Sequence, residues 1–113
     1  MSEQEYRALI YQFIANIPEG KVATFGLLAA LAGNPKAARR AARAVAHAPD
    51  GLPCHRVVKA GGELVPGYVF GQGEQQARLI AEGVMFTDDG RVRLSDHLWK
   101  TDEALEKLAT QGK

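Results

Sequence analysis

Apolar residues recur at helical spacing in the first part of the chain. The set comprises Tyr6, Leu9, Ile10, Phe13, Ile14 and Ile17. Separations of three or four residues place these side chains on one face, so the pattern predicts an amphipathic helix over residues 3–17. The segment Pro18-Glu19-Gly20 is expected to end this helix.

Two further helices are predicted at close spacing. Thr24 suits the N-cap of a helix from Phe25 to Ala32, which is nearly all apolar and is therefore expected to be buried. In the junction Gly33-Asn34-Pro35, glycine suits a helix C-terminus with positive φ, asparagine suits an N-cap, and proline suits the first helical position. A third helix is predicted from Lys36 to about Ala48, ended by Pro49. Two short helices joined by such a turn are typical of a helix-turn-helix motif, whose second helix enters a DNA groove.

The middle of the chain predicts short strands before one more helix. Val57-Val58 and Leu64-Val65 flank a glycine-containing turn over residues 59–63, and we expect them to form a hairpin or wing. A fourth helix is predicted from about Glu74 to Glu82, where Gly83 ends it.

The last part of the chain combines a turn with a polar segment. Asp89-Gly90 predicts a turn between extended segments at 84–86 and 91–94. Residues 100–113 are polar, and both a frayed helix from Thr101 and a disordered tail are compatible with them. The sequence thus predicts one domain over residues 1–99, mainly α with small β elements, followed by a polar C-terminal tail over residues 100–113.

Composition narrows the class of protein. With 113 residues, 46% of them hydrophobic, the chain has enough apolar content for one modest core. It contains no run of about 18 apolar residues, which a membrane-spanning helix needs. Its polar, acidic start is unlike a secretory or transit segment. The single cysteine excludes an internal disulfide and favours a reducing, cytoplasmic setting.

Charge is distributed unevenly, although the net charge is only +1. Basic residues gather between positions 36 and 59, where Asp50 is the one acid: Lys36, Arg39, Arg40, Arg43, Arg56 and Lys59. This distribution predicts a basic patch that faces an anionic partner such as DNA.

The third helix has an unusual composition, because alanines surround Arg39, Arg40 and Arg43 over residues 37–46. Alanine is a strong helix former, so helix propensity with a solvated charged face is one interpretation. The arginine spacing places all three within one face. A helix surfaced by alanine is also thin enough to approach a minor groove about 6 Å wide. We favour DNA contact because it also accounts for the clustered like charges.

The segment Pro53-Cys54-His55-Arg56-Val57-Val58 holds the only cysteine and one of the three histidines. The residues alone leave four roles open for Cys54: a buried structural thiol, a metal ligand, a redox sensor and a nucleophile. A metal site is disfavoured because the three histidines lack ligand spacing, and a redox sensor has no second cysteine as partner. A strand after the pair would fix its position. Any contact between Cys54 and His55 must then cross a bend or pass through a water.

Residues 53–57 resemble the active-site signature of the O6-alkylguanine-DNA alkyltransferases. Supporting blocks follow the family's order at 29–39, 67–71 and 81–83, so the resemblance covers residues 5–99. It implies a winged helix-turn-helix domain that binds the minor groove of double-stranded DNA and flips out an O6-alkylated guanine. The alkyl group then moves irreversibly to cysteine. Such a methylated-DNA–protein-cysteine S-methyltransferase acts once and needs no cofactor, and we expect it to be a monomer.

The resemblance also implies roles for single residues at the reaction centre. Cys54 falls on the alkyl acceptor, and His55 with Glu82 falls on the pair that deprotonates the thiol through a water. The wall of the base pocket falls on Pro53, Tyr68 and Val69.

DNA-binding roles are implied in the same way. Arg39 falls on the arginine that fills the gap left by the flipped base, and Ala37 and Ala38 fall on small residues packed against the groove. Further contacts with DNA fall on Thr24, Phe25 and Arg40.

The chain departs from the family pattern at three places. Phe25 stands where the family usually has a tyrosine, whose hydroxyl is thought to donate a proton to the leaving guanine, so slower alkyl transfer is expected. Ala46-His47-Ala48-Pro49 lacks the asparagine that commonly precedes this proline. The segment from Arg39 to Cys54 is also shorter than in the longer family members, so the pocket lip is expected to differ.

These departures keep two other functions open. The alkyltransferase-like proteins share the fold and the DNA-binding mode but typically replace the cysteine by tryptophan. The alternative function is therefore a non-enzymatic sensor that flips alkylated guanine and recruits excision-repair proteins. Cys54 favours chemistry, whereas Phe25 favours the sensor. A winged-helix regulator that keeps the signature by descent is the third alternative.

Overall fold

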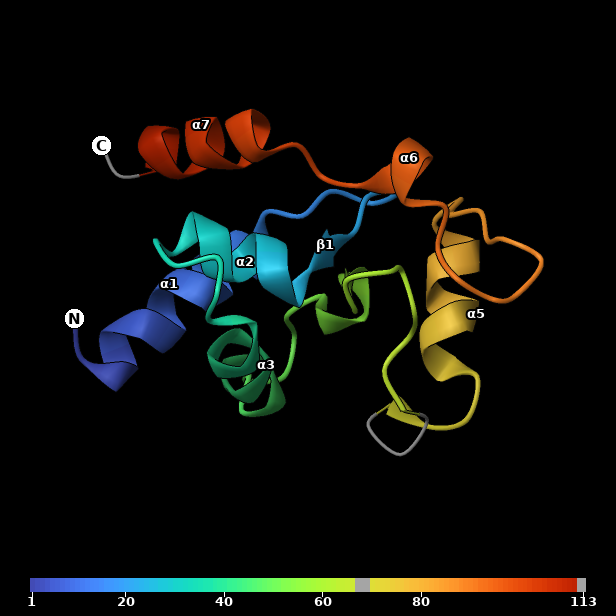
Figure 1. The fold of residues 1–113 in the computed structure, drawn as a ribbon, viewed down its shortest axis with the longest axis horizontal. Helices are drawn as coiled ribbons and strands as arrows, with labels where there is room; N and C mark the ends of the chain where they lie inside the picture. The colour runs from blue at the N-terminus through green and yellow to red at the C-terminus, as the bar shows by residue number, and fades with distance from the viewer. Residues whose placement is uncertain (67–69, 112–113) are drawn as a thin grey trace.

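Helices account for most of the regular secondary structure (Figure 1), and a two-stranded sheet contains the segment that follows Cys54. The computed structural model describes residues 1–66 and 70–111, except the side chains of 107–111. In chain order the elements are α1 (Glu3–Ala15), β1 (Ala23–Thr24), α2 (Phe25–Leu31), α3 (Ala38–Ala46), the 3₁₀ turn η1 (Cys54–Arg56), β2 (Val57–Val58), α5 (Glu74–Ala81), α6 (Leu94–His97) and α7 (Thr101–Gln111). This composition confirms the predicted class, mainly α with small β elements.

The helix α1 begins at a complete capping box. The Ser2 hydroxyl accepts the Glu5 N–H at 3.1 Å, and the Glu5 carboxylate accepts the Ser2 N–H at 3.0 Å. The predicted apolar face is buried at Tyr6, Ile10, Phe13 and Ile14. The helix ends at Ala15 rather than at residue 17, but Ile17 still packs into the core.

The helix α2 begins where predicted but is less buried than predicted. The Thr24 hydroxyl caps it by accepting the Leu27 N–H at 3.0 Å. Only Leu28 and Ala29 are buried, and Ala30 is exposed. The expected burial is only partial, because packing against α3, α7 and β1 leaves part of the circumference of α2 uncovered.

The helix α3 starts later and ends earlier than the predicted span from Lys36 to Ala48. Asn34 does not cap the helix, because its side chain accepts the Lys36 N–H at 3.0 Å and closes a turn. The helix begins at Ala38 without a side-chain cap, and His47 is its C-terminal cap. Gly33 has the predicted left-handed backbone, with a φ of 107°.

The sheet consists of β1 and β2 in parallel, with Ala23 opposite Val57 and Thr24 opposite Val58. The predicted hairpin partner of β2, Leu64-Val65, is therefore wrong. The turn itself exists, because the Lys59 N–H donates to the Glu63 carbonyl at 2.9 Å. Beyond this turn, the Val65 N–H donates to the side chain of Gln75 at 2.9 Å instead of to β2.

Two predicted features of the last third of the chain are confirmed. Gly83, with a φ of 86°, ends α5, and the Val84 N–H donates to the Leu79 carbonyl at 3.0 Å as in a Schellman motif. The turn at Asp89-Gly90 joins an antiparallel bridge between Phe86 and Val92.

Residues 101–111 form a helix, which decides between the two conformations that the polar pattern left open. This helix, α7, packs against α1 and α2, and Ala104 is buried in the same cluster as Trp99. Figure 1 shows α7 beside the helices at the end of the molecule that carries both termini. Within the described residues, no helix is long and apolar enough to cross a membrane.

Two hydrophobic clusters meet at β2. The larger cluster gathers residues of α1, α2, α3 and α7, and it includes Val57. The smaller cluster contains Val22, Val58, Leu79, Val84 and Val92. Because the two valines of β2 belong to different clusters, the segment after Cys54 is anchored on both sides.

Candidate functional site

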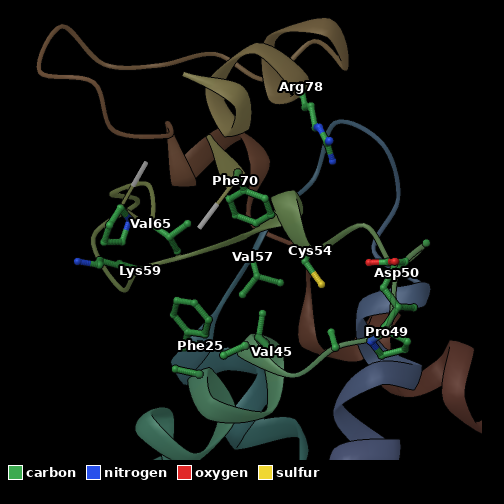
Figure 2. A pocket seen from close by; sticks show the side chains of 16 residues that line it. Phe25, Val45, Pro49, Asp50, Cys54, Val57, Lys59, Val65, Phe70 and Arg78 are labelled. Atoms are coloured by element: carbon green, nitrogen blue, oxygen red, sulfur yellow. The ribbon is translucent and has the colours of Figure 1, made fainter. Parts of the chain in front are cut away.

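Cys54 opens into a cavity of about 680 Å³ at the junction of α2, α3 and the segments around β2. Figure 2 shows the Cys54 sulfur directed into this space, with Phe25, Val45 and Phe70 around it. Apolar side chains dominate the lining, and Asp50, Lys59 and Arg78 contribute charge. We call this space the Cys54 cavity. Its size falls in the range of pockets that hold a small organic ligand, and a flipped nucleobase is such a ligand.

The Cys54 thiol is partly buried, and burial raises its pKa. A raised pKa lowers the fraction of thiolate at neutral pH, and the thiolate is the nucleophile. A thiol in this state needs a base within reach before it can act as a nucleophile.

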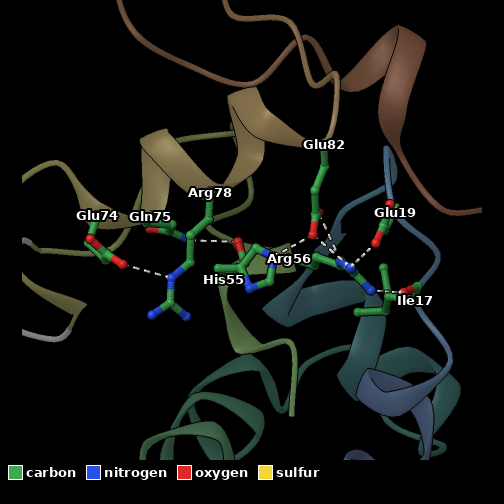
Figure 3. A network of polar contacts seen from close by, with 8 residues as sticks. All are labelled: Ile17, Glu19, His55, Arg56, Glu74, Gln75, Arg78 and Glu82. Carbon is green, nitrogen blue, oxygen red and sulfur yellow. Dashed lines mark hydrogen bonds and ion pairs between the residues drawn. The ribbon is translucent and has the colours of Figure 1, made fainter. Parts of the chain in front are cut away.

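A network of charged side chains includes His55 and Arg56, the two residues that follow Cys54 in η1 (Figure 3). His55 Nε2 lies 3.0 Å from Glu82 Oε2. Arg56 donates from Nε to Glu82 Oε1 at 2.9 Å and from Nη2 to Glu82 Oε2 at 2.7 Å. A third bond runs from Arg56 Nη1 to the Ile17 carbonyl at 2.7 Å. Residues from η1, from the end of α5 and from the chain after α1 thus converge at one point.

The hydrogen bonds of this network indicate the charge of Glu82 and the ring nitrogen of His55 that carries a proton. The hydrogen bonds from Arg56, followed by that from His55, hold the pKa of Glu82 below its usual value despite partial burial. Glu82 is therefore a carboxylate at neutral pH, and His55 donates its Nε2–H to it. In the neutral imidazole, Nδ1 is then the acceptor, and this atom is buried without a hydrogen-bond partner among the described residues. This lone pair is what a general base requires.

Arg56 is the main site residue that the sequence pattern placed wrongly. It was expected in an exposed basic patch, whereas only 13% of its side chain is exposed, and it clamps Glu82. The bonds to Glu82 are also the largest cause of the raised pKa of Arg56. The resemblance had assigned Glu82 to the reaction centre, and a partly buried carboxylate is stabilised by a nearby cation, so this assignment was the available signal.

The arginines of α3 do not all share one face. Arg39 and Arg43 are exposed. Arg40 instead turns toward α1, where its guanidinium lies 3.8 Å from the Tyr6 ring centroid and 3.0 Å from Glu3 Oε2. The structure therefore leaves two arginines of α3 facing solvent rather than the three that the spacing predicted.

The remaining predicted site residues are placed as follows. Phe25 lines the Cys54 cavity and also packs against the larger cluster. Ala37 and Ala38 are half-buried at the start of α3, and the Thr24 hydroxyl is engaged as the cap of α2. Pro53 precedes η1 and is not among the residues that line the cavity. Tyr68 and Val69 lie outside the described residues.

Metal ligands do not gather in the described part of the chain. No three side chains among its His, Cys, Asp and Glu residues lie close enough together to hold a metal ion.

Known proteins share this sequence and fold. Residues 5–84 match the family model described as 6-O-methylguanine DNA methyltransferase, DNA binding domain. The chain is 39% identical over 99 residues to the DNA base-flipping protein of Escherichia coli, which is 86% of this chain and 76% of that protein. It is 36% identical over 81 residues to a methylated-DNA–protein-cysteine methyltransferase of Methanosarcina acetivorans, which is 70% of this chain and 51% of that protein.

A solved structure extends the likeness to three dimensions. Schizosaccharomyces pombe Atl1, in complex with damaged DNA containing O6-carboxymethylguanine, superposes with a TM-score of 0.75 at 31% identity. The match covers 88% of this chain and 99% of that one. It confirms the predicted helix-turn-helix type of fold. On the strength of the family model and these relatives, the chain belongs to the 6-O-methylguanine DNA methyltransferase family and carries the DNA-binding domain of that family.

Proposed function

We propose that the protein binds double-stranded DNA containing O6-alkylated guanine, turns the damaged base into the Cys54 cavity, and transfers the alkyl group to Cys54. The observation that carries the proposal is the Cys54 sulfur directed into a cavity of base-holding size (Figure 2). The network of His55, Glu82 and Arg56, which begins at the residue after Cys54, supports the proposal because His55 would supply the base that a thiol of raised pKa requires. Relatives named for base flipping and for cysteine methyltransfer support the same substrate class.

The reaction is one displacement at carbon. The Cys54 sulfur forms a bond to the alkyl carbon while the bond from that carbon to guanine O6 breaks, and its electrons stay on the purine. The thiol proton leaves toward the His55 side and is balanced by one proton taken up by the released guanine. The thioether is stable, so each molecule reacts once.

Contact with DNA is assigned to α3. Its exposed Arg39 and Arg43 are free to approach phosphates, and the half-buried Ala37 and Ala38 leave its start slim enough for a narrow groove. Insertion of Arg39 into the vacated stack would offset part of the flipping cost, which is a few kcal/mol. Arg40 reaches DNA only if it leaves Glu3.

Transfer is tested by intact mass. The protein is incubated in excess with an oligonucleotide carrying O6-methylguanine, with Cys54→Ser as the matched control. We expect the wild-type mass to rise by one methylene group, the peptide containing Cys54 to carry it, and the control to remain unchanged. If the wild-type mass is unchanged after prolonged incubation and the lesion is still present, the transfer step is contradicted.

A non-enzymatic lesion sensor is the second candidate function. Two observations favour it: burial raises the pKa of the thiol, and Phe25 brings no hydroxyl to the cavity. The sensor would bind methylated DNA selectively, would keep this selectivity in Cys54→Ala, and would show no mass change. Recruitment of excision-repair proteins belongs to this alternative. Binding that ignores alkylation would instead support a sequence-specific regulator.

Arg39 and Arg40 are predicted to behave differently in DNA binding. Arg39→Ala should weaken binding to the lesion about tenfold and to undamaged DNA less, because its proposed place is the gap behind the flipped base. Arg40→Ala is the matched control on the same helix and should lower the slope of log affinity against log salt by about one only if Arg40 leaves Glu3 for a phosphate. Fluorescence anisotropy across salt concentrations measures both. Equal effects of the two substitutions on lesion preference would remove the special role of Arg39.

A further inference from the structure

Gln75 is a buried polar residue with all its bonds directed at backbone. It is 4% exposed and lies in the second position of α5. Its Nε2 donates to the carbonyls of His55 at 3.1 Å and Val57 at 3.0 Å. Its Oε1 accepts the Val65 N–H at 2.9 Å. One side-chain amide thus joins the segment that carries Cys54 to the segment after the Lys59–Glu63 turn.

The groups that Gln75 joins are those that a hairpin would pair directly. The Lys59 N–H donates to the Glu63 carbonyl, so residues 59 and 63 lie opposite each other at the hydrogen-bonding position next to the turn. In an antiparallel ladder such pairs recur every second residue on each strand, so the next one would be Val57 with Val65. The Gln75 amide lies between the Val57 carbonyl and the Val65 N–H. The hairpin is therefore held open after its first pair.

This separation has a consequence for the Cys54 cavity. Val57 and Val65 both line the cavity. A direct ladder bond would bring the Val65 nitrogen and the Val57 oxygen to about 2.9 Å. With the amide between them, two hydrogen bonds of 2.9 and 3.0 Å and the amide group itself span the gap.

We propose that Gln75 is a spacer that sets the width of the Cys54 cavity between Val57 and Val65, and thereby the bulk of the O6 substituent that the protein accepts. Gln75 acts through the backbone and is a positioning residue. Its role for the O6 substituent rests on the proposed function, whereas its effect on the cavity does not. Without the amide, the Val57 carbonyl and the Val65 N–H have each other as the nearest replacement partners, and the cavity narrows.

The test compares Gln75→Ala with Gln76→Ala, the same change at the next residue of α5, which makes none of these contacts. Cys54 is the only cysteine, so intact mass reports its reaction with a small probe, iodoacetamide, and with a bulky one, N-phenylmaleimide. In Gln75→Ala, we expect the rate with N-phenylmaleimide divided by the rate with iodoacetamide to fall about tenfold, because a smaller pocket discriminates against the larger probe. In Gln76→Ala, this ratio should stay at the wild-type value. An unchanged ratio in Gln75→Ala, or an equal fall in both variants, would overturn the spacer.

A DNA readout then links the spacer to the lesion. The affinity for O6-benzylguanine DNA relative to O6-methylguanine DNA should also fall about tenfold in Gln75→Ala, while the affinity for undamaged DNA is kept. Equal losses on all three DNAs would mean that Gln75 merely supports the fold. If the wild type shows no lesion preference, the proposed function fails, and the thiol-probe ratio still decides the role of Gln75. If circular dichroism shows that Gln75→Ala is unfolded, Gln75→Met replaces it, because methionine keeps most of the side-chain volume and lacks the amide. A thiol-probe ratio at the wild-type value in Gln75→Met would then overturn the proposal.

Discussion

Replacement of Arg56 by glutamine is expected to lower the free energy of unfolding by about 3 kcal/mol at neutral pH. The change leaves the Glu82 carboxylate, of which only 15% is exposed, without its cation, and it leaves the Ile17 carbonyl without its donor. Removal of one partner from a largely buried pair costs more than the pair contributes, because the remaining charge stays desolvated. Urea unfolding followed by circular dichroism measures the loss.

The pH dependence separates this cause from a general packing defect. The pKa of Glu82 is held below its ordinary value of 4.5, so its contribution to stability is complete above that value and is lost as the pH falls through the lower folded pKa. The difference between wild type and Arg56→Gln should therefore shrink in acid. Arg78→Gln breaks an exposed pair with Glu74 and should cost less than about 0.5 kcal/mol. A loss that is the same in acid and at neutral pH, or no larger than that of Arg78→Gln, would contradict the role of the pair.

Phe25→Tyr is expected to speed the proposed alkyl transfer by one to two orders of magnitude, roughly 10- to 100-fold. The Phe25 ring lines the cavity that holds Cys54, so a phenol at this position brings a proton donor to the cavity wall. Departure of the guanine requires a proton in place of the alkyl group, and a positioned donor lowers that barrier. Single-turnover rates, followed by intact mass on DNA with O6-methylguanine, measure the gain.

Phe70→Tyr is the matched control for this experiment, because Phe70 is the other described aromatic residue of the cavity lining. It adds the same hydroxyl at a different place and should leave the rate within about threefold of wild type, since general-acid catalysis depends on the position of the donor. Equal gains in both variants would point to polarity rather than proton donation. Transfer in neither variant would agree with the sensor.

Features that depend on neighbouring residues were predictable from the sequence. The face of α1 follows from apolar spacing alone, and Ser2 with Glu5 completes its start. Gly83 ends α5 because glycine adopts a left-handed backbone without strain, and Asp89-Gly90 turns the chain for a similar local reason. That Cys54 belongs to a helix-turn-helix protein was likewise predictable, because the family signature around Cys54 is a run of consecutive residues.

Features that depend on distant partners were not predictable. Arg40 leaves the exposed face of α3 because Tyr6 and Glu3, on another helix, offer a ring and a charge. The hairpin after Val58 fails because a glutamine on α5 reaches into it. Arg56 is drawn inward by Glu82, which lies 26 residues away along the chain. In each case a side chain from another element determines the local structure, and the spacing of apolar and polar residues does not indicate that contact.

The division of β2 between the two hydrophobic clusters bears on how the molecule opens. Val57 and Val58 are neighbours in sequence, so neither cluster can come apart without disturbing the strand that the other one grips. Local unfolding is thereby coupled across the molecule, and the chain next to Cys54 opens only with the whole domain. Amide hydrogen exchange would then be slowest at the residues beside the Cys54 thiol. For the proposed single transfer, the segment that carries Cys54 would then lie in the part of the fold that is last to become mobile.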